Sequence, residues 1–525
     1  MRCIFPSKII LVMFILIALP ILLTTEGANA TIYYVSTTGS DFNPGTSTQP
    51  LRTITKGVLK LSAGDTLYVA SGTYTDSIDT WKVPFQNGIS WSTPITVAAQ
   101  PGHTVTIKPK EGNPFFWIAH SQNKYLIIKG FIIDGQNTNS HGFKFEGSAK
   151  YVRVQDCEVK NSRLSGILVT GNSSSYHEFI NLNVHHNGTT RLDHGLYLSS
   201  GNNLIEKSKV HHNKGYGLHI YNGSTTAANN NILRNNTVYN NTTSGQWGCG
   251  IFLSSGSGNQ AYNNLAFGNF AGLCTHYRAS NSRFFNNITY ENKVYGIYVG
   301  SSTTNGARVE NNTVYKNGTY GIFVGDGANT TIIKNNIVHA NGINFGLTNT
   351  TSSNNFDSNP SFVNAAGNDF HLQAGSPAID KGTTISGLSA DFDGKPRPKG
   401  AQFDIGAYEY QGSTSTSSTS TNSTSTNSTS TTNTFPPPLI SPTPGSTLTS
   451  PTVTFSGSHT STDLEHMLSI GNTHGGSQIS SSKSMGTSHS MTVSGLPASG
   501  IIYVSYWTRK STGWFRTIHY YRMNR

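Results

Sequence analysis

The sequence predicts an all-β protein, a right-handed parallel β-helix followed by a small β-sandwich domain. Charged residues make up only 12% of the 525 residues while glycine alone numbers 54, and Gly, Asn, Ser and Thr favour turns over helices. Short alternating strands recur every 22 to 33 residues through the middle of the chain, which is typical of a solenoid. A stretch rich in Ser, Thr and Asn then precedes a last segment with strands of its own.

Residues 1–30 are predicted to be a signal peptide. Arg2 and Lys8 give it a positive start, an apolar run extends from Ile9 to Leu23, and Ala28-Asn29-Ala30 has the small residues of a cleavage site. An uncleaved signal anchor is the alternative. No later segment is apolar enough to cross a bilayer. We therefore expect a monomer that is secreted, extracellular or associated with the cell surface.

Three cysteines remain after this leader: Cys157, Cys249 and Cys274. An odd, sparse set in an exported protein argues against a disulfide framework. Cys249 and Cys274 lie on neighbouring coils but at different positions of the repeat. We therefore expect buried free thiols.

The repeat itself can be aligned by hand. One half is a glycine followed by an alternating strand, and it begins at Gly142, Gly166, Gly195, Gly217, Gly250, Gly272, Gly296, Gly321 and, weakly, Gly346. The other half pairs asparagine with a short strand, as in Asn236-Thr237-Val238-Tyr239 and Asn312-Thr313-Val314-Tyr315. Two short strands bounded by Gly or Asn predict one coil of a solenoid.

One asparagine recurs at the same position of successive coils. Stacked coils place equivalent residues about 4.8 Å apart, so the side-chain amides of this column are predicted to bond to backbone from coil to coil. The predicted column consists of Asn187, Asn213, Asn269, Asn292, Asn317 and Asn341.

The terminal coils need caps, because they would otherwise expose an apolar cross-section. Ile54, Val58 and Leu61 have helical spacing and predict a short helix over the first coil. Strands are expected to follow at residues 66–69 and 95–98.

Both ends of the repeat region also carry a family resemblance. Tyr33-Tyr34-Val35-Ser36, Gly64-Asp65-Thr66 and Gly72-Thr73-Tyr74 resemble the opening of secreted β-helix proteins of the pectate-lyase-like superfamily. Residues 375–380, 391–398 and 404–409 resemble the terminal segment of the same proteins. The resemblance implies a β-helix over residues 31–410 and export, but not one reaction, because this fold carries lyases, hydrolases, epimerases and proteins without known chemistry.

Residues 411–438 are predicted to be a flexible linker, since almost all of them are Ser, Thr, Asn or Pro. Residues 439–525 alternate like the strands of a sandwich at 453–455, 491–493, 501–506 and 518–521. Parts of this segment resemble the immunoglobulin-like modules appended to exported microbial enzymes. The prediction is an immunoglobulin- or fibronectin-like β-sandwich.

Side-chain direction in the glycine-containing strands locates a candidate site. The apolar positions of Gly-apolar-x-apolar face the interior, so x and the residue two positions later face solvent. On the middle coils these outward positions and the corner before them carry histidine, tyrosine and arginine. We predict as catalytic residues Arg191, His194, Tyr197, His219 and Tyr221. We predict as substrate-binding residues His141, Lys144, Asp193 and His276.

A second outward row is predicted to form a stabilising stack of rings, with a sugar platform as the alternative. It consists of His185, His211, Tyr239, Phe267, Tyr290, Tyr315 and His339. His186 and His212 stack beside it, but no ligand spacing typical of a metal site is present, and no metal site is predicted. Calcium at Asp391 and Asp393 is the one cofactor considered, and capping of loop amides by these carboxylates is preferred to it.

The residue types favour some reactions over others. A glycosidase needs two carboxylates, and Glu206 is the only acidic residue between Gly195 and Tyr290. β-Elimination or C5-epimerisation of a uronic acid needs a cation, a base and an acid instead. The formal charge of +11 also favours an anionic partner. We therefore predict an acidic polysaccharide as partner and no nucleic acid.

Two departures keep a second interpretation open. The aspartate calcium box and the arginine motif of calcium-dependent pectate lyases are missing, and Leu192-Asp193-His194-Gly195 is only loosely similar to the Asp-Pro-His segment of alginate epimerases. The alternative is a non-catalytic glycan-binding or adhesin-like surface protein.

Overall fold

The computed structural model describes residues 30–412 and 439–524, with short gaps at 111, 120–122, 224–226, 243–247, 301–302, 326, 443–446, 458–463, 472–478, 487, 489 and 511–512. The chain divides into two compact units, Met1–Ser415 and Thr416–Arg525. The predicted signal peptide, apart from its last residue, and nearly all of the predicted linker lie outside the described residues.

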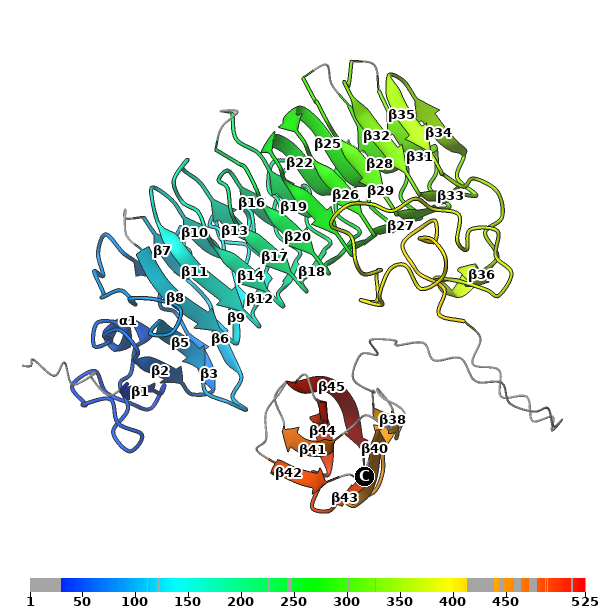
Figure 1. Cartoon of the computed structure of the whole chain (residues 1–525). Helices are drawn as coiled ribbons and strands as arrows, with labels where there is room; N and C mark the ends of the chain where they lie inside the picture. Colours follow the sequence, from blue (N-terminus) through cyan, green and yellow to red (C-terminus); the bar gives the residue numbers. More distant parts are fainter. Residues whose placement is uncertain are drawn as a thin grey trace, which may run out of the picture. The chain divides into compact units, whose positions relative to one another are not determined.

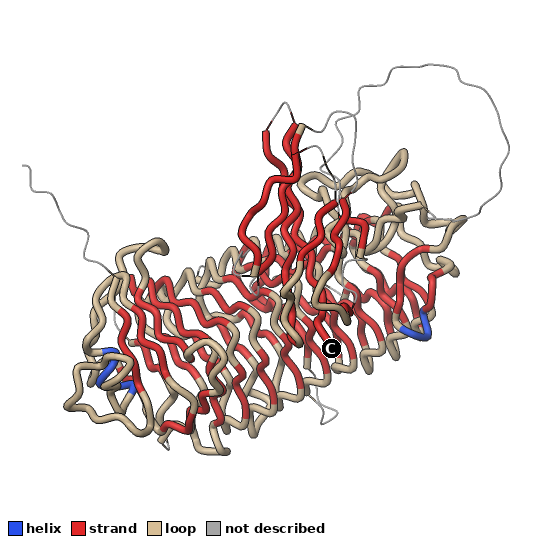
Figure 2. The backbone as a smooth tube through the Cα atoms, turned by 90° about the horizontal axis from the view of Figure 1, so that it is seen from below, coloured by secondary structure: helices blue, strands red, loops and turns tan. Residues whose placement is uncertain are grey.

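The first unit is a parallel β-helix in which successive coils stack their strands into three parallel sheets (Figures 1 and 2). Sheet 1 contains β1 (Ile32–Val35), β2 (Thr66–Val69), β5 (Ile95–Ala99), β8 (Asn123–Lys129), β11 (Lys150–Gln155), β14 (Glu178–Ile180), β17 (Leu204–Glu206), β20 (Ile232–Arg234), β23 (Gln260–Tyr262), β26 (Arg283–Phe285), β29 (Arg308–Glu310), β32 (Thr331–Lys334) and β35 (Thr350–Ser353). Sheet 2 contains β3 (Gly72–Tyr74), β6 (Val105–Ile107), β9 (Phe131–Asp134), β12 (Glu158–Lys160), β15 (Asn183–His185), β18 (Lys209–His211), β21 (Thr237–Tyr239), β24 (Leu265–Phe267), β27 (Ile288–Tyr290), β30 (Thr313–Tyr315) and β33 (Ile337–His339). Sheet 3 contains β4 (Ile78–Asp79), β7 (Phe116–Ile118), β10 (Phe143–Phe145), β13 (Ile167–Val169), β16 (Leu196–Leu198), β19 (Leu218–Ile220), β22 (Cys249–Ser257), β25 (Ala271–Ser280), β28 (Tyr295–Val299), β31 (Tyr320–Val324) and β34 (Ile343–Leu347).

The prediction of two strands per coil is wrong, because each central coil has three. The predicted Gly strands form sheet 3 and the predicted Asn strands form sheet 2. Two strands of sheet 1 were predicted, at residues 66–69 and 95–98, and they are confirmed as β2 and β5. The sheet 1 strands of the later coils were missed because their central residue alone is buried in most coils, as with Ile205 in β17 and Ala261 in β23. One buried residue in three gives no alternation to detect.

The interior of the β-helix is apolar and continuous from coil to coil. In sheet 3 the first and third residues of a strand point inward, and Ile167, Leu196 and Leu218 are fully buried in the same column. One hydrophobic cluster accordingly extends from Val35 to Val338. In the three-residue strands of sheet 3, such as β13 and β16, the middle residue points outward, and this alternation sets the face on which the candidate site lies.

The predicted asparagine column is confirmed, with Asn241 as a further member. Asn213 Oδ1 accepts from the backbone N of Asn187 at 3.1 Å and from its Nδ2 at 3.0 Å, and the same pattern repeats down the column. The structure contains two more asparagine ladders, one per corner of the coil. They include Asn203, Asn231 and Asn259 at one corner and Asn236, Asn264, Asn287, Asn312 and Asn336 at the other.

The predicted N-terminal helix is confirmed as α1 (Ile54–Val58), which buries Ile54 and Val58. Its side-chain cap is Thr53, whose hydroxyl accepts from Lys56 N. At the other end the chain passes through β36 (Phe362–Asn364), a short 3-10 helix (Ala365–Gly367) and β37 (Asp369–Leu372) into an irregular segment that continues to residue 412.

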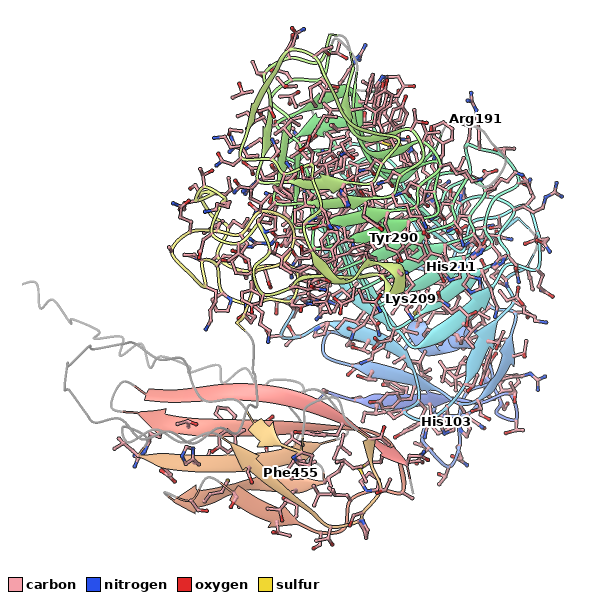
Figure 3. The ribbon with its side chains drawn as sticks, turned by 90° about the vertical axis from the view of Figure 1, so that its right-hand side faces the viewer. His103, Arg191, Lys209, His211, Tyr290 and Phe455 are labelled. Atoms are coloured by element: carbon pink, nitrogen blue, oxygen red, sulfur yellow. A yellow bond between two sulfur atoms is a disulfide. The ribbon has the colours of Figure 1, made fainter. Side chains whose placement is uncertain are left out.

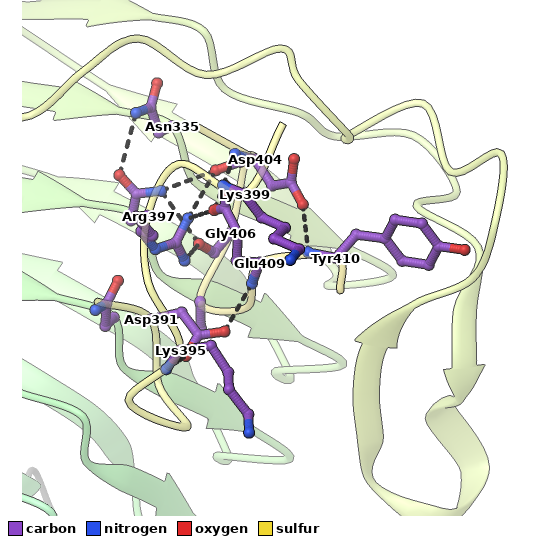
Figure 4. A network of polar contacts seen from close by, with 12 residues as sticks. Asn335, Asp391, Lys395, Arg397, Lys399, Asp404, Gly406, Glu409 and Tyr410 are labelled. Carbon is purple, nitrogen blue, oxygen red and sulfur yellow. Dashed lines mark hydrogen bonds and ion pairs between the residues drawn. The ribbon is translucent and has the colours of Figure 1, made fainter. Parts of the chain in front are cut away.

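A buried ionic network fixes this C-terminal segment (Figure 4). Arg397 Nη1 is 2.7 Å from Glu409 Oε2, both side chains are fully buried, and Arg397 also donates to the carbonyls of Asp404 and Gly406. Asn311 donates to the same two carbonyls from the β-helix. The network therefore ties the segment to the last coils.

The second unit contains a three-stranded and a five-stranded sheet. The strands are β38 (Leu439–Ser441), β40 (Val453–Gly457) and β43 (Ser490–Val493) in one, and β39 (Thr447–Leu448), β45 (Gly513–Asn524), β44 (Ser499–Lys510), β41 (Glu465–Gly471) and β42 (Ser480–Gly486) in the other. Phe455 of the first sheet and Leu468, Ile502 and Tyr521 of the second share one hydrophobic cluster. Within the described residues of the chain, no helix has the length and hydropathy of a membrane span.

Candidate functional site

The predicted catalytic residues lie together around one pocket on the outer face of sheet 3. The pocket has a volume of about 460 Å³ and is called the aromatic pocket below. It is lined by Arg191, Leu192, His194, Tyr197, Tyr216, His219, Tyr221, Phe252 and Tyr277. All five residues predicted as catalytic are among these nine.

Strand register explains why these side chains meet. Tyr197 at the centre of β16 pairs with His219 of β19, which pairs with Phe252 of β22. The prediction that Tyr197 and His219 lie on adjacent coils is thus confirmed. The corner before β16 supplies His194, whose ring stacks on Tyr216, the equivalent corner residue one coil later, at 4.7 Å between centroids.

The two histidines of the pocket belong to a chain of hydrogen bonds. Tyr216 N donates to His194 Nδ1 at 3.1 Å, so the neutral His194 ring carries its proton on Nε2. That nitrogen lies 3.0 Å from His219 Nδ1 and donates to it. His219 Nε2 then donates to Ser254 Oγ at 2.9 Å, and Ser254 donates to the carbonyl of Ile220 at 3.1 Å. The chain fixes both tautomers and uses every ring nitrogen.

Burial keeps both rings neutral. His194 is 4% exposed and His219 is 7% exposed. Loss of hydration disfavours the imidazolium, which lowers the pKa of His194 to about 4 and that of His219 well below its usual value, where the nearby His194 adds to the effect. Although His219 occupies an outward position, as predicted, the rings of Tyr221 and Phe252 cover it from either side, at 5.6 and 5.1 Å.

The groups that face the pocket opening are different. Tyr221 is 36% exposed and Tyr277 52% exposed, and Tyr197 is half-buried. Among the described residues, the hydroxyls of Tyr197 and Tyr221 have no hydrogen-bond partner and the exposed guanidinium of Arg191 has no ion-pair partner. Burial raises the pKa of Tyr197, and the neighbouring Tyr221 raises it further. The pocket therefore offers phenol hydroxyls and one cation, and no carboxylate lines it.

None of the four predicted substrate-binding residues lines this pocket. The Asp193 carboxylate turns back to accept from Thr189 N and from the N and Oγ1 of Thr190, so it shapes the corner. Lys144 points outward two strands from Tyr197, but its ammonium lies 2.8 Å from Glu146 and over the Trp117 ring.

His141 occupies the predicted corner, where its Nδ1 donates to the carbonyl of Ser165 at 3.2 Å. Burial lowers its pKa to about 4. Neither its position nor its bonding brings it into the aromatic pocket.

His276 was also predicted to face the site, but Tyr277 takes that place. The register between β22 and β25 shifts after Leu253, so that β25 contains one more residue than its partner. Tyr277 adopts a φ of +57° at this bulge and lines the pocket, while His276 stacks on Tyr298 at 5.7 Å. Bulges leave no signal in a hydrophobic pattern.

The prediction from the sequence also missed Tyr216, which lines the aromatic pocket, and the Cys249–Cys274 disulfide. Tyr216 precedes the glycine of its repeat as His194 does, and this shared position was the available signal.

Cys249 and Cys274 form a disulfide with Cα atoms 6.1 Å apart, so the expectation of free thiols is wrong for this pair. Coil stacking pairs Cys249 with Ala271 and Phe252 with Cys274, so the two cysteines are three residues apart in register, and the disulfide still joins them across the neighbouring coils. Cys157 is a buried free thiol, as expected.

The described residues contain no group of three or more His, Cys, Asp or Glu side chains arranged to hold a metal ion. Asp391, considered for calcium, accepts from the backbone N of Asp393, Lys395 and Glu409, and Asp393 lies 2.9 Å from His371 Nε2. These contacts favour the amide-capping interpretation of the loop.

Comparison with known proteins finds three family models that each match part of the chain. A model described as the Pel9A-like right-handed β-helix region matches residues 33–193, and a right-handed β-helix region model matches residues 117–282. The chain is a right-handed parallel β-helix, and these partial matches support a relation to the pectate-lyase-like superfamily. A model of the periplasmic copper-binding protein NosD matches residues 226–371.

Individual relatives of this β-helix protein are distant. Pectate lyase L of Dickeya chrysanthemi is 27% identical over 195 residues, 36% of this chain and 39% of that protein. The chain thus matches about two fifths of the length of this curated relative. The crystal structure of pectate lyase Pel9A is 20% identical with a TM-score of 0.51, covering 72% of this chain and 96% of that one. The A-module of the Azotobacter vinelandii mannuronan C-5 epimerase AlgE6 is 18% identical with a TM-score of 0.44, covering 57% and 91%.

Proposed function

We propose that this protein acts on an acidic polysaccharide at the aromatic pocket, by β-elimination or C5-epimerisation of a uronic acid residue. The observation that carries the proposal is the set of groups at the pocket opening. Among the described residues, Arg191 has no ion-pair partner, the hydroxyls of Tyr197 and Tyr221 have no hydrogen-bond partner, and no carboxylate lines the pocket. This combination suits an anionic sugar and does not suit hydrolysis, which uses two carboxylates.

Arg191 is assigned the role of binding the uronate carboxylate. A guanidinium binds a carboxylate through two parallel hydrogen bonds. The same pairing makes the proton on the adjacent C5 carbon easier to remove, because the negative charge that develops on the carboxylate is stabilised. The partly exposed rings of Tyr221 and Tyr277 provide apolar surface for the sugar.

The tyrosine hydroxyls are assigned the proton transfers. In β-elimination a base takes the C5 proton, the bond from C4 to the glycosidic oxygen breaks as the C4–C5 double bond forms, and an acid protonates the departing oxygen. The raised pKa of Tyr197 keeps its proton in place at neutral pH, which suits the acid role. Tyr221 is assigned the base role, which it performs as the phenolate, and after each elimination it releases the C5 proton to solvent while Tyr197 takes one up. Epimerisation uses the same abstraction, followed by return of a proton to the opposite face of C5.

His194 and His219 are assigned a positioning role instead of the predicted proton transfer. Both are nearly buried, both are neutral, and all four ring nitrogens are used within the chain from Tyr216 to Ser254. They pack against Tyr197 at 5.6 and 5.2 Å and against Tyr216 at 4.7 and 4.8 Å. Their contribution is to hold the tyrosines in place.

Three further observations support the proposal. Pectate lyase L is named for an acidic polysaccharide and is similar to part of this chain. The Cys249–Cys274 disulfide is typical of proteins that leave the reducing cytosol, in agreement with the proposed signal peptide. The second unit has two sheets around one core, which fits the proposed immunoglobulin-like module of a secreted or surface-associated monomer.

A non-catalytic glycan-binding protein is the second candidate. The observation in its favour is that the imidazoles, the usual proton-transfer groups near neutral pH, are saturated with hydrogen bonds. A panel of uronic acid polymers distinguishes the two. An eliminase produces a rise in near-ultraviolet absorbance from the unsaturated uronate, whereas an epimerase changes the proton NMR spectrum of the polymer without breaking it.

The proposal predicts one of these two activities. Arg191→Ala is expected to weaken that activity on every active polymer. The control variant Arg52→Ala, on the N-terminal cap, is expected to leave the activity unchanged. Retention of a polymer in affinity electrophoresis without either activity supports the binding candidate. Neither activity nor retention on any acidic polymer contradicts both.

A further inference from the structure

Four histidines form a two-by-two array on the outer face of sheet 2, away from the aromatic pocket. His185 and His186 follow one another on one coil, and His211 and His212 repeat the pair on the next, since His185 aligns with His211 between β15 and β18. The rings stack across the coils, His185 on His211 at 4.8 Å and His186 on His212 at 5.2 Å, with interplanar angles of 4° and 2°. Figure 3 labels His211 and Lys209 side by side on this face.

Backbone conformation brings each pair together. Neighbouring residues of a strand point to opposite faces, but His186 and His212 adopt the left-handed conformation with a φ of +54° each. The corner residue therefore turns its ring toward the preceding one. His185 Nδ1 lies 2.7 Å from His186 Nδ1, and His211 Nδ1 lies 2.8 Å from His212 Nδ1.

The opposite nitrogens fix which ring atoms carry protons. His185 Nε2 lies 3.1 Å from Glu158 Oε1, and His211 Nε2 lies 3.1 Å from Asn183 Oδ1. Both oxygens are acceptors, so Nε2 of His185 and of His211 carries the proton and donates. His185 and His211 are called the inner rings below, and His186 and His212 the outer rings. The inner Nδ1 atoms are then left with lone pairs that point at the outer rings.

We propose that the histidine array binds a divalent transition-metal ion, with the two Nδ1 atoms of one coil as a chelating pair. Metal–imidazole bonds are about 2.0–2.1 Å long, so two such nitrogens at a right angle around one ion are roughly 2.9 Å apart. To match, each pair opens slightly and the outer ring, His186 or His212, moves its proton from Nδ1 to Nε2, so that both Nδ1 atoms present a lone pair to the ion. The array does not surround one point with three or more ligands; it supplies two nitrogens per coil, and water completes the coordination.

The contacts around the inner rings fit this role. Metal-binding histidines typically donate their second N–H to a carboxylate or carbonyl oxygen, which orients the ring, and Glu158 and Asn183 occupy these positions. His186 and His212 are exposed, which gives an ion access from solvent. Neutral imidazole favours copper(II), nickel(II) and zinc over calcium, and affinity is expected to follow that order, with copper(II) highest.

The fold supplies a matched variant for the test. The same left-handed corner position holds Asn161 on the coil before the array and Asn240 on the coil after it, with φ of +56° and +52°. His186→Asn and His212→Asn therefore keep the local backbone while removing one nitrogen of each pair. His339→Asn, on the last strand of the same sheet, removes a histidine that has no adjacent partner and serves as the control.

The experiment is titration of the full chain with copper(II) and separately with zinc at neutral pH, followed by isothermal calorimetry and by the nitrogen hyperfine pattern of bound copper. The wild type and His339→Asn are expected to bind and to show imidazole nitrogens, and calcium is expected to give no binding. The double variant His186→Asn/His212→Asn is expected to lose at least tenfold in affinity with an unchanged melting temperature in the absence of metal. No binding by the wild type, or undiminished binding by the double variant, overturns the proposal. Since the array shares no residue with the aromatic pocket, the result is independent of the polysaccharide activity.

Discussion

Mild acid is predicted to destabilise the β-helix through three buried histidines. His177, His194 and His219 are each less than 10% exposed. Burial lowers the pKa of His177 to about 3 and that of His194 to about 4, and lowers that of His219 well below its usual value. The unfolded chain, with ordinary pKa values near 6.5, therefore binds more protons than the folded chain below neutrality, and stability falls as the pH falls.

The size of the effect follows from the pKa differences. Between pH 7 and pH 5.5 the unfolded state gains most of a proton per histidine while the folded state gains almost none, which corresponds to about 1.2 kcal/mol for each group. The three together give a loss of about 4 kcal/mol. His141 and His211, whose pKa values are each lowered to about 4, add to the loss. His371 opposes it, because Asp393 and Asp369 raise its pKa to about 9 and its contribution to stability grows as the pH falls toward 5.5.

Equilibrium urea unfolding at the two pH values, followed by circular dichroism, measures this loss. The matched variant is His177→Asn, because the next coils have Asn203, Asn231 and Asn259 at this position. It is expected to remove about 1 kcal/mol of the pH dependence. Equal stability at pH 7 and 5.5, or a pH dependence in the variant equal to that of the wild type, would refute the reasoning.

Three further predictions concern stability in the same unfolding assay. Asn264→Ala removes the acceptor of Asn236 N and leaves buried groups unsatisfied, so it is expected to cost about 2–3 kcal/mol. Asn139→Ala, at an exposed position, is expected to cost less than about 0.5 kcal/mol, and equal costs would contradict the ladder. Cys274→Ser opens a disulfide that spans 25 residues and is expected to cost about 3 kcal/mol, a loss that a reducing agent should reproduce in the wild type. Arg397→Met leaves the Glu409 carboxylate buried without its partner and is expected to cost about 3–5 kcal/mol; a neutral result would show that the network is dispensable.

The periodic part of this fold could be predicted from the sequence, because equivalent positions of the repeat occupy equivalent positions on stacked coils. Gly195 and Gly217 mark equivalent strands, and their register places Tyr197 beside His219, as observed. The asparagine column was predictable for the same reason. Sheet 1 was predictable only in its first coils, as β2 and β5. In the later coils a strand with a single buried residue such as Ile205 does not alternate.

The sequence predicted which residues form the aromatic pocket better than it predicted their chemical roles. Position along a coil locates Arg191, His194 and Tyr221 on one face, but it does not report how neighbouring rings cover a side chain. His219 points outward and is still nearly buried, because Tyr221 and Phe252 lie on either side of it. The bulge at Tyr277 and the disulfide depend on local backbone geometry, which an alignment of equivalent repeat positions does not contain.

The measurement that tests the central claim most directly is the turnover of Tyr197→Phe on the uronic acid polymer on which the wild type is most active. Removal of one hydroxyl leaves the ring packing against His194 and His219 intact, so the fold and the KM are expected to change little. If the hydroxyl transfers a proton, kcat should fall by about a hundredfold or more, while Tyr34→Phe, on sheet 1, keeps wild-type turnover. A kcat for Tyr197→Phe within a factor of two of the wild type would contradict the assignment of the aromatic pocket as the site of proton transfer.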